Sequence, residues 1–298
     1  WVPAANMGGS MKFTELGLSP EILEGISRLG FETPTPVQAA VIPAILSNGR
    51  DLVALAQTGT GKTAAFGLPV LQMLDTDIKT PQTLILCPTR ELCMQIARDL
   101  ENFAACVRGV RVLAVYGGAD IRQQLSAMVR GVDIVVATPG RMVDLLRRKR
   151  ADFSKIKRVV LDEADEMLNM GFEEDLEAIL SEVPDGAQTL LFSATMPRPV
   201  VALAQSILRD PVEITTAVHE STNNDIEQLF YVIEDSERTN AVIRLIDAED
   251  VGKAIIFCRT REETDSLNIL LGGRGYNVNC LHGDMEQAQR NRVMAAFR

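Results

Sequence analysis

The sequence offers little that would place the protein in a membrane or in an oxidising compartment. No apolar run approaches the roughly 20 residues that a helix needs to cross a bilayer, and no signal-peptide pattern is visible. The five cysteines are odd in number and form no C-x-x-C pair, which argues against a disulfide framework and against a cysteine-rich zinc site. We therefore expect a cytoplasmic protein with reduced thiols and no membrane partner.

Basic residues are also in short supply. The 298 residues include 30 Lys and Arg against 40 Asp and Glu, so the formal net charge is −10. Taken alone, this balance argues against nucleic acid as a partner, because the neutralisation of phosphates requires clustered cations. Two possibilities stay open: a local basic groove on an acidic body, or a basic segment outside residues 1–298.

The chain does contain ample globular material in an alternating order. Hydrophobic residues make up 46% of the sequence, and its length suggests about two domains. Short apolar runs, which predict strands, alternate with longer helical patterns. Such alternation predicts an α/β fold in which helices cover both faces of a parallel sheet, and ligands of such folds bind at the carboxyl ends of the strands.

The pattern also suggests where the domains lie. Residues 1–10 resemble an expression remnant before Met11, and we leave them out of the fold. In the first domain, 11–215, the predicted strands are 52–56, 83–87, 110–116, 133–137, 158–161, 189–192 and 212–214. The predicted helices there are 20–28, 38–45, 90–105, 121–129, 141–148, 172–182 and 199–207.

A polar linker at 216–225 separates this domain from a second alternating set at 226–298. Its predicted strands are 228–233, 254–258 and 277–281, and its predicted helices are 237–247, 264–271 and 287–297. Three strands and three helices are few for a free-standing doubly wound domain. We therefore expect the second domain to be incomplete.

A phosphate-binding loop is the strongest local signal. After the strand at 52–56 the chain passes through a glycine-containing loop into a helix start, and the loop comprises Ala56, Gln57, Thr58, Gly59, Thr60, Gly61, Lys62 and Thr63. This matches G-x-x-x-x-G-K-[ST] except that Ala56 stands at the first glycine. Glycines let backbone N–H groups surround phosphate oxygens, and the helix N-terminus adds its positive dipole end. Lys62 would reach the β- and γ-phosphates, and Thr63 would place its hydroxyl on Mg²⁺.

A pair of adjacent carboxylates ends the predicted strand at 158–161. Asp162 fits the acid that holds Mg²⁺ at such a strand end in phosphate-loop enzymes. Glu163 could orient and deprotonate an attacking water. The alternative is an acidic strand end that caps a helix, but the phosphate loop favours the catalytic interpretation of Lys62, Asp162 and Glu163.

Asp162-Glu163-Ala164-Asp165 spells the motif that names the DEAD-box RNA helicases, and other stretches resemble that family in the same order. These stretches are Phe13 with 30–38, then 56–63, 88–92, 117–118, 138–141, 193–195, 256–260 and 282–290. The resemblance covers residues 13–298. Single pieces such as Ser-Ala-Thr are weak signals, whereas the combination is highly specific.

The resemblance implies two RecA-like domains and an adenine-recognising Q motif. Phe31, Thr33 and Gln38 belong to that motif, and the amide of Gln38 can pair with a donor and an acceptor of adenine, which selects ATP. Phe13 would stack on the adenine face. The alternatives are a hydrophobic staple for Phe13 and a helix-capping position for Gln38. Ser193 and Thr195 would couple the nucleotide site to domain closure.

The resemblance also implies RNA as a partner. In the first domain the implied contacts follow three predicted strands, at Pro88, Thr89, Arg90, Gly117, Gly118, Thr138, Pro139, Gly140 and Arg141. In the second domain they are Arg259, Thr260, His282, Gly283, Gln287 and Arg290. Hydroxyls, backbone N–H groups and guanidinium groups contact phosphates and sugars, which predicts little sequence preference. For any one of the first-domain residues alone, ordinary loop capping is the favoured interpretation, but together they favour RNA contacts. We interpret the basic run 147–150 as a solvated helix end, with an RNA contact as the alternative.

Together these features predict an ATP-dependent helicase that closes on ATP and RNA, bends one strand and releases its partner. RNA is expected over DNA because the 2′-OH is readable. The family's motifs that contact the ribose and the γ-phosphate are not found within residues 1–298, so we expect nucleotide binding with weak hydrolysis and no unwinding from this chain. An ATP-gated RNA clamp in a larger assembly, or another NTPase acting on DNA or protein, are the alternatives.

Overall fold

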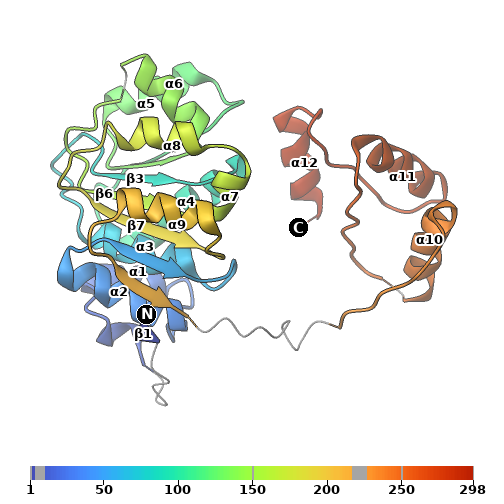
Figure 1. Ribbon diagram of the computed structural model, residues 1–298, viewed down its shortest axis with the longest axis horizontal. Coiled ribbons are helices and arrows are strands. Elements are labelled where there is room, and N and C mark those ends of the chain that lie inside the picture. Colours follow the sequence, from blue (N-terminus) through green and yellow to red (C-terminus); the bar gives the residue numbers. More distant parts are fainter. Residues whose placement is uncertain (1, 4–10, 150, 217–226, 250, 298) are drawn as a thin grey trace. The chain divides into compact units, whose positions relative to one another are not determined.

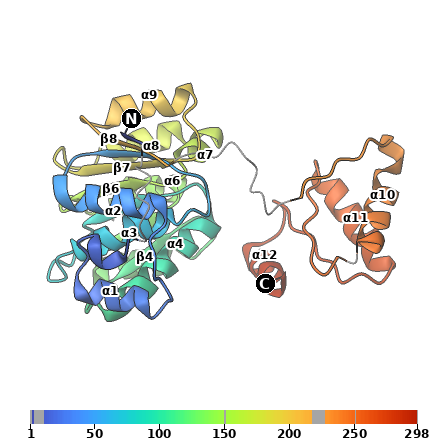
Figure 2. The same cartoon turned by 90° about the horizontal axis from the view of Figure 1, so that it is seen from below.

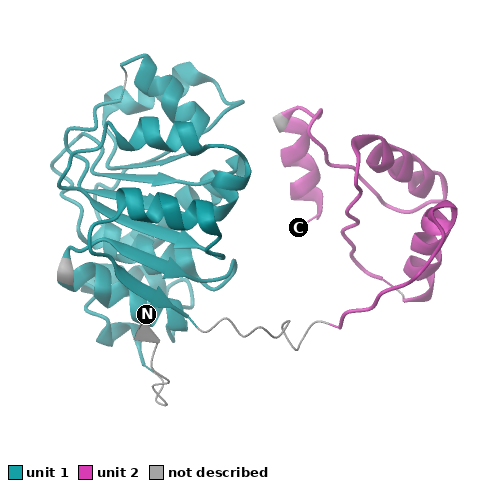
Figure 3. Cartoon of the chain, viewed as in Figure 1, with its two compact units in different colours: residues 1–221 teal, residues 222–298 magenta. Residues whose placement is uncertain are grey.

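The computed structural model describes residues 2–3, 11–149, 151–216, 227–249 and 251–297. The chain divides into two compact units, residues 1–221 and 222–298 (Figure 3). The predicted linker at 216–225 lies almost wholly outside the described residues. In the part of the chain that the structure describes, no helix is both long and apolar enough to cross a membrane.

Unit 1 is built on a parallel sheet with the strand order β1-β8-β2-β7-β6-β3-β5-β4 (Figure 1). The strands are β1 (Val2–Pro3), β2 (Leu52–Leu55), β3 (Thr83–Leu86), β4 (Val112–Val115), β5 (Ile134–Ala137), β6 (Arg158–Leu161), β7 (Gln188–Ser193) and β8 (Val212–Thr215). The chain therefore has the α/β fold with a parallel sheet that its apolar runs predict.

Side chains of each central strand alternate between two cores. In β5, Ile134 and Val136 join one core, whereas Val135 and Ala137 join the other. Because successive side chains of a strand point to opposite faces, both faces of the sheet are buried. Figure 2 shows the sheet between two layers of helices.

Helices from the first half of the unit 1 sequence cover one face of the sheet, and helices from the second half cover the other face. The first core takes residues from α1 (Pro20–Ser27), α2 (Pro36–Asn48), α3 (Lys62–Gln72) and α4 (Arg90–Phe103). The second takes residues from α5 (Ile121–Arg130), α6 (Pro139–Arg147), α7 (Ala164–Asn169), α8 (Glu173–Leu180) and α9 (Arg198–Ile207). Short 3₁₀ turns lie at Phe13–Glu15 and Ala104–Cys106. Helix α7 has only six residues and was not predicted by the sequence pattern.

Two expectations about the chain are wrong in detail. Residues 1–10 are not wholly outside the fold, because Val2 and Pro3 pair with Ile214 and Thr215 of β8. The edge of a sheet offers unpaired backbone groups that any short extended segment can meet.

The second correction concerns unit 2. It contains a 3₁₀ turn at Asp235–Glu237 and the helices α10 (Arg238–Ala248), α11 (Arg261–Gly273) and α12 (Gln287–Phe297). Its predicted strands 228–233, 254–258 and 277–281 have no strand pairing among the described residues. Phe230, Val232 and Phe257 are about nine-tenths exposed (89%, 92% and 92%). Apolar composition predicts a strand only where a neighbouring strand and a core are present to receive it.

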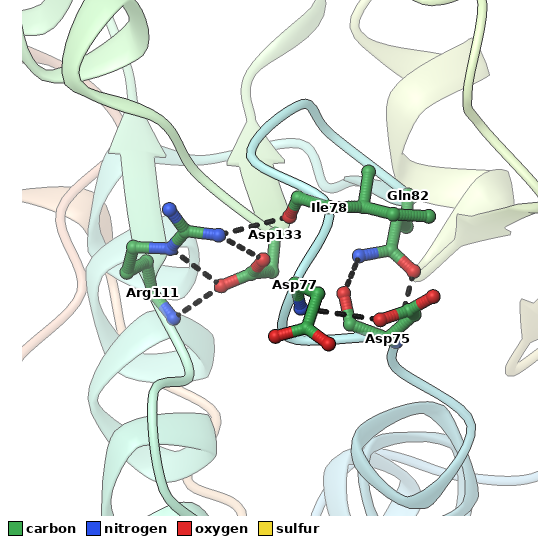
Figure 4. Close-up of polar contacts among 6 residues, drawn as sticks. All are labelled: Asp75, Asp77, Ile78, Gln82, Arg111 and Asp133. Carbon is green, nitrogen blue, oxygen red and sulfur yellow. Dashed lines mark hydrogen bonds and ion pairs between the residues drawn. The ribbon is translucent and has the colours of Figure 1, made fainter.

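A group of polar contacts, the polar lock, joins Asp75, Ile78, Gln82, Arg111 and Asp133 at the end of the sheet where β3, β4 and β5 begin (Figure 4). The carboxylate of Asp133 is fully buried and accepts hydrogen bonds from Arg111 N at 2.7 Å, Nε at 2.9 Å and Nη2 at 2.6 Å. Arg111 Nη2 also donates to the Ile78 carbonyl at 2.9 Å. The amide of Gln82 exchanges two further bonds with the backbone of Asp75. The lock therefore ties the loop before β3 to β4 and β5.

We expect Asp133→Asn to lower the free energy of unfolding of unit 1 by about 1.5–3 kcal/mol, because it weakens the hydrogen bonds between a buried carboxylate and Arg111, whose side chain is 29% exposed. Asp144→Asn is the matched control, since Asp144 pairs with Arg148 on an exposed helix face at 2.9 Å and should cost at most about 1 kcal/mol. Urea unfolding measures both. Similar losses in the two variants would contradict the assignment of the lock.

Candidate functional site

The loop that joins β2 to α3 has the backbone shape of an anion cradle. Gly59 and Gly61 have φ angles of +81° and +87°, and Gly61 is the N-cap of α3, so the N-terminus of this helix opens at the loop. Thr60 Oγ1 donates to the Gln57 carbonyl at 2.7 Å and tightens the turn. Ala56 is buried and its N–H donates to the Ser193 carbonyl of β7, which fixes the loop to the sheet.

Lys62 and Asp162 meet at the base of this loop. Lys62 Nζ lies 3.7 Å from Asp162 Oδ1, and the two side chains are only 5% and 4% exposed. Neither atom has a hydrogen-bond partner among the described residues. Burial, together with the smaller effect of the Glu163 charge, raises the pKa of Asp162 to about 6 against the opposing effect of Lys62. A buried ammonium and carboxylate that lack hydrogen-bond partners fit a phosphate oxygen and a hydrated cation, and Thr63 follows Lys62 as the second residue of α3.

Glu163 adopts a left-handed backbone conformation, with φ 55° and ψ 52°, at the N-cap of α7. The Glu163 charge still acts on Asp162, because it contributes to the raised pKa of that carboxyl. Burial raises the pKa of the Glu163 carboxyl, while Lys62 opposes that change. A carboxyl group with a raised pKa next to a phosphate cradle is suited to accept a proton from water.

Asp165 is a functional candidate that the sequence analysis left without a role. Its Oδ2 accepts hydrogen bonds from Thr195 N at 3.0 Å and Thr195 Oγ1 at 2.8 Å. Burial acts to raise the pKa of Asp165, but hydrogen bonds from Thr195 and Ser193 outweigh it and the pKa is lowered. Ser193 Oγ donates to the Thr195 carbonyl at 2.6 Å. The carboxylate motif is thus bonded directly to the Ser-Ala-Thr segment after β7.

Gln38 occupies the capping position that was the alternative interpretation. Thr35 N donates to Gln38 Oε1 at 2.8 Å, while Gln38 N donates to Thr35 Oγ1 at 3.4 Å, which makes a capping box at the start of α2. Gln38 Nε2 also donates to the Gly61 carbonyl at 3.1 Å. The amide therefore connects α2 to the phosphate loop and keeps one N–H and one oxygen lone pair for a ligand. Thr33 is exposed nearby in sequence.

The structure packs Phe13 instead of presenting it. Phe13 is 4% exposed and belongs to the first core, with its ring centroid 5.9 Å from that of Phe31. Phe31 in turn makes an edge contact with Phe103 at 5.7 Å and is half-buried. The hydrophobic packing alternative therefore describes Phe13 in this structure, and Phe31 retains more exposed ring surface for a base.

The residues implied as RNA contacts of unit 1 follow β3, β4 and β5, which are adjacent in the sheet. A Cβ on Gly117 or Gly118 would touch the guanidinium group of Arg90, so these segments are in contact. Thr89 caps α4 by accepting from Leu92 N at 3.2 Å. Pro88 and Thr138 are buried, whereas Gly118 and Gly140 are exposed.

Arg141, which follows Pro139 and Gly140 at the start of α6, is held by the protein. Its Nη1 donates to the Ala119 carbonyl at 3.2 Å and to Gln124 Oε1 at 2.9 Å. These bonds orient the guanidinium group beside the loop after β4. In the basic run, Arg148 pairs with Asp144 on an exposed face, as a solvated helix end would, and residue 150 lies outside the described residues.

The implied RNA residues of unit 2 are grouped by short-range contacts. Thr260 caps α11 and accepts from Glu263 N at 3.1 Å, and Arg259 pairs with the Glu263 carboxylate at 3.4 Å. His282 Nε2 lies 3.1 Å from Asp265 Oδ1. Gly283 is exposed and Arg290 is half-buried, while the side chain of Gln287 lies outside the described residues.

Comparison with known proteins identifies the family. Residues 35–203 match the model of the DEAD/DEAH box helicases, and residues 237–298 match that of the helicase conserved C-terminal domain. The chain belongs to the DEAD/DEAH box helicase family. It is 46% identical over 282 residues to the ATP-dependent RNA helicase DeaD of Escherichia coli, covering 95% of this chain and 45% of that protein. It is 44% identical over 286 residues to the DEAD-box ATP-dependent RNA helicase CshA of Bacillus cereus, covering 96% and 54%.

Solved structures of the family share the fold. A DEAD box protein from Methanococcus jannaschii is 38% identical, with a TM-score of 0.67 over 96% of this chain and 77% of that one. Dbp5 of Saccharomyces cerevisiae bound to RNA and ADP BeF₃ is 31% identical, with a TM-score of 0.87 over 96% and 73%. The chain spans about half the length of the curated relatives it matches.

A matched pair of substitutions tests the contact between Gln38 and the phosphate loop. Gly59→Ala places a side chain at positive φ with nothing within 4 Å, and should lower the free energy of unfolding by about 1–2 kcal/mol. Gly61→Ala adds a collision of the new Cβ with Gln38 Nε2, so we expect a larger loss. Urea unfolding compares them, and equal losses would show that Gln38 does not restrict position 61.

The raised pKa of Asp162 predicts a pH dependence of stability. A carboxyl whose pKa moves from 3.8 to about 6 on folding stabilises the fold below about pH 4, and this contribution is lost as the pH rises to about 6. The loss amounts to about 3 kcal/mol at about 1.4 kcal/mol per pKa unit. The difference in unfolding free energy between Asp162→Asn and the unsubstituted chain should therefore change across this range. A difference that stays constant from about pH 4 to pH 7 would contradict the prediction.

Proposed function

We propose that the protein is an ATP-dependent RNA helicase that hydrolyses ATP to ADP and phosphate and separates short RNA duplexes. The observation that carries this proposal is the buried pair of Lys62 Nζ and Asp162 Oδ1, which lies beside a cradle of backbone N–H groups and lacks hydrogen-bond partners among the described residues. Burial without partners is costly, so these atoms are suited to a ligand that supplies both negative oxygens and a cation.

Each group in the site has a task in ATP hydrolysis. Lys62 would bind the β- and γ-phosphates, together with the loop from Ala56 to Gly61. Thr63 and Asp162 would hold Mg²⁺, which when bound neutralises phosphate charge. Glu163 would position the attacking water and take its proton, in keeping with the raised pKa of its carboxyl.

Selectivity for ATP would come from Gln38, whose amide keeps one donor and one acceptor after its bonds inside the protein. Because Gln38 also contacts Gly61, occupation of the base site would bear directly on the phosphate loop. Half-buried Phe31 is the more accessible aromatic ring for stacking in this structure.

The RNA path would cross the carboxyl ends of β3, β4 and β5. Thr89, Gly118 and Gly140 offer a hydroxyl and backbone groups there, and Arg90 and Arg141 offer charge. Groups of these kinds contact phosphates and sugars, so binding should depend on salt and little on sequence. Relatives named as RNA helicases and the Dbp5 structure with bound RNA support RNA as the polymer.

Coupling between the two sites would run through Asp165. Its bonds to Thr195 place the carboxylate motif and the Ser193–Thr195 segment in one hydrogen-bonded unit. Binding of ATP and RNA would change the conformation of this segment, and release of phosphate would reverse the change. We further infer that the 298-residue chain binds nucleotide through unit 1 and turns it over slowly, because the described residues of unit 2 form no sheet from which to present further catalytic groups.

The deciding experiment measures ATP hydrolysis with and without single-stranded RNA over a salt series, for this chain and for a longer form of the protein. RNA should stimulate the longer form, and the stimulation should fall with salt. Glu163→Gln should reduce turnover by roughly 10²–10⁴-fold with nucleotide binding retained. Glu174→Gln is the matched control, since Glu174 is an exposed acid on α8 that is not among the groups that shift the pKa of Glu163, and it should leave turnover near its normal value.

Single-turnover strand separation on a short duplex completes the test. Release of one strand upon ATP binding supports a helicase, whereas retention of RNA without release would favour an ATP-gated clamp. If RNA leaves hydrolysis unchanged in the longer form, the proposal fails.

A further inference from the structure

Unit 2 contains a cluster of metal-ligating side chains that the proposed ATP hydrolysis does not use, although His282 is also one of the implied RNA contacts. Cys280 and His282 lie on either side of Leu281, and Asp265 lies in α11. One ligand atom from each of the three residues lies within 4.8 Å of the other two. Residues two apart in a chain can direct their side chains to the same side, which explains how Cys280 and His282 converge on one carboxylate.

The donor set identifies a class of cation. Thiolate, imidazole and carboxylate are the ligands that Zn²⁺ takes in proteins, whereas Mg²⁺ prefers oxygen ligands alone. Around a tetrahedral Zn²⁺ with bonds of about 2.0–2.3 Å, neighbouring ligand atoms are roughly 3.3–3.8 Å apart. His282 Nε2 and Asp265 Oδ1 are 3.1 Å apart, and the ligand atom of Cys280 lies within 4.8 Å of both, so the three atoms are near the spacing that the ion requires.

The surrounding charges leave Asp265 available. Arg261 pairs with Asp284, and Arg259 pairs with Glu263, so these two guanidinium groups have carboxylates other than Asp265. Among the described residues His282 is the ion-pair partner found for Asp265. The Asp265 carboxylate is 52% exposed, which leaves room for a water molecule as a further ligand and for entry of the ion.

The orientation of His282 agrees with a ligand role. Its side chain is 14% exposed, and Nδ1 has no hydrogen-bond partner among the described residues. The polar contact that directs the ring is therefore the one between Nε2 and Asp265, which points Nε2 into the cluster.

We propose that Asp265, Cys280 and His282 form a binding site for a thiophilic divalent cation of the Zn²⁺ class. The cation would join the segment 280–282 to α11 through three protein ligands. This site shares no residue with the nucleotide site or with the RNA residues of unit 1, and its test requires neither ATP hydrolysis nor RNA.

Titration of the reduced, metal-free chain with Co²⁺ is the first test. One equivalent should bind and give thiolate-to-cobalt charge-transfer absorption together with ligand-field bands of tetrahedral intensity, and Zn²⁺ should displace it. Cys280→Ser should remove the charge-transfer absorption. Residues that only orient a metal ligand typically change affinity by about 10–100-fold when they are substituted, and Asp265→Asn should weaken Co²⁺ binding by more than this.

Cys258→Ser and Asp235→Asn are matched controls, since they remove a partly exposed thiol and an exposed carboxylate of unit 2 that lie outside the cluster. Both should bind Co²⁺ as the unsubstituted chain does. A charge-transfer band that survives in Cys280→Ser, or that disappears in Cys258→Ser, would overturn the assignment.

A second measurement needs no variant and so does not depend on the folding of one. Zn²⁺ should slow alkylation of Cys280 in the unsubstituted chain, read by mass spectrometry, and leave the rate at Cys258 unchanged. Equal rates at Cys280 with and without Zn²⁺ would also overturn the proposal.

Discussion

The interaction on which unit 1 depends is that between the buried ammonium of Lys62 and the buried carboxylate of Asp162, which are 3.7 Å apart. Among the described residues, neither Lys62 Nζ nor Asp162 Oδ1 has a hydrogen-bond partner. Attraction between Lys62 and Asp162 offsets part of the cost of removing both charges from water, but each keeps bonding capacity unused. Two chain segments a hundred residues apart are held at this point because β2 and β6 end at the same edge of one sheet. The parallel sheet, the loop glycines and the start of α3 together hold Lys62 next to Asp162.

The architecture of unit 1 was predictable because its physics is local and repetitive. Apolar runs long enough for a buried strand, such as Leu84 to Leu86 or Val159 to Leu161, alternate with amphipathic helices, and each central strand contributes side chains to both cores. The same reasoning failed at Phe230, Val232 and Phe257, whose composition is that of strands but which have no described pairing. A strand is defined by its neighbours, and a single sequence does not reveal whether they are in place. Helix α7 escaped notice because six residues are too few to establish a period.

The candidate site likewise has a part that could be predicted from the sequence and a part that could not. Motif order predicted that Lys62 and Asp162 would meet, because both follow strands of one sheet. It did not predict that Asp165 bonds Thr195, or that Gln38 combines a capping box with a bond to Gly61, since these contacts depend on side-chain directions between separate elements. For Phe13 the motif position predicts a base contact, whereas the structure buries the ring in the first core; the stacking role stays a prediction.

Glu163 sits in a left-handed turn that suits glycine or asparagine better than glutamate. The sheet and α7 impose this conformation, so the fold bears a standing backbone strain of about 1–2 kcal/mol at the residue that presents the second carboxylate. Selection for thermal stability alone would favour glycine or asparagine at this position, because either residue would relieve the strain in the turn. Stability and chemistry are therefore opposed at position 163, and a hardier relative of this protein would be expected to find its extra strength elsewhere in the sheet.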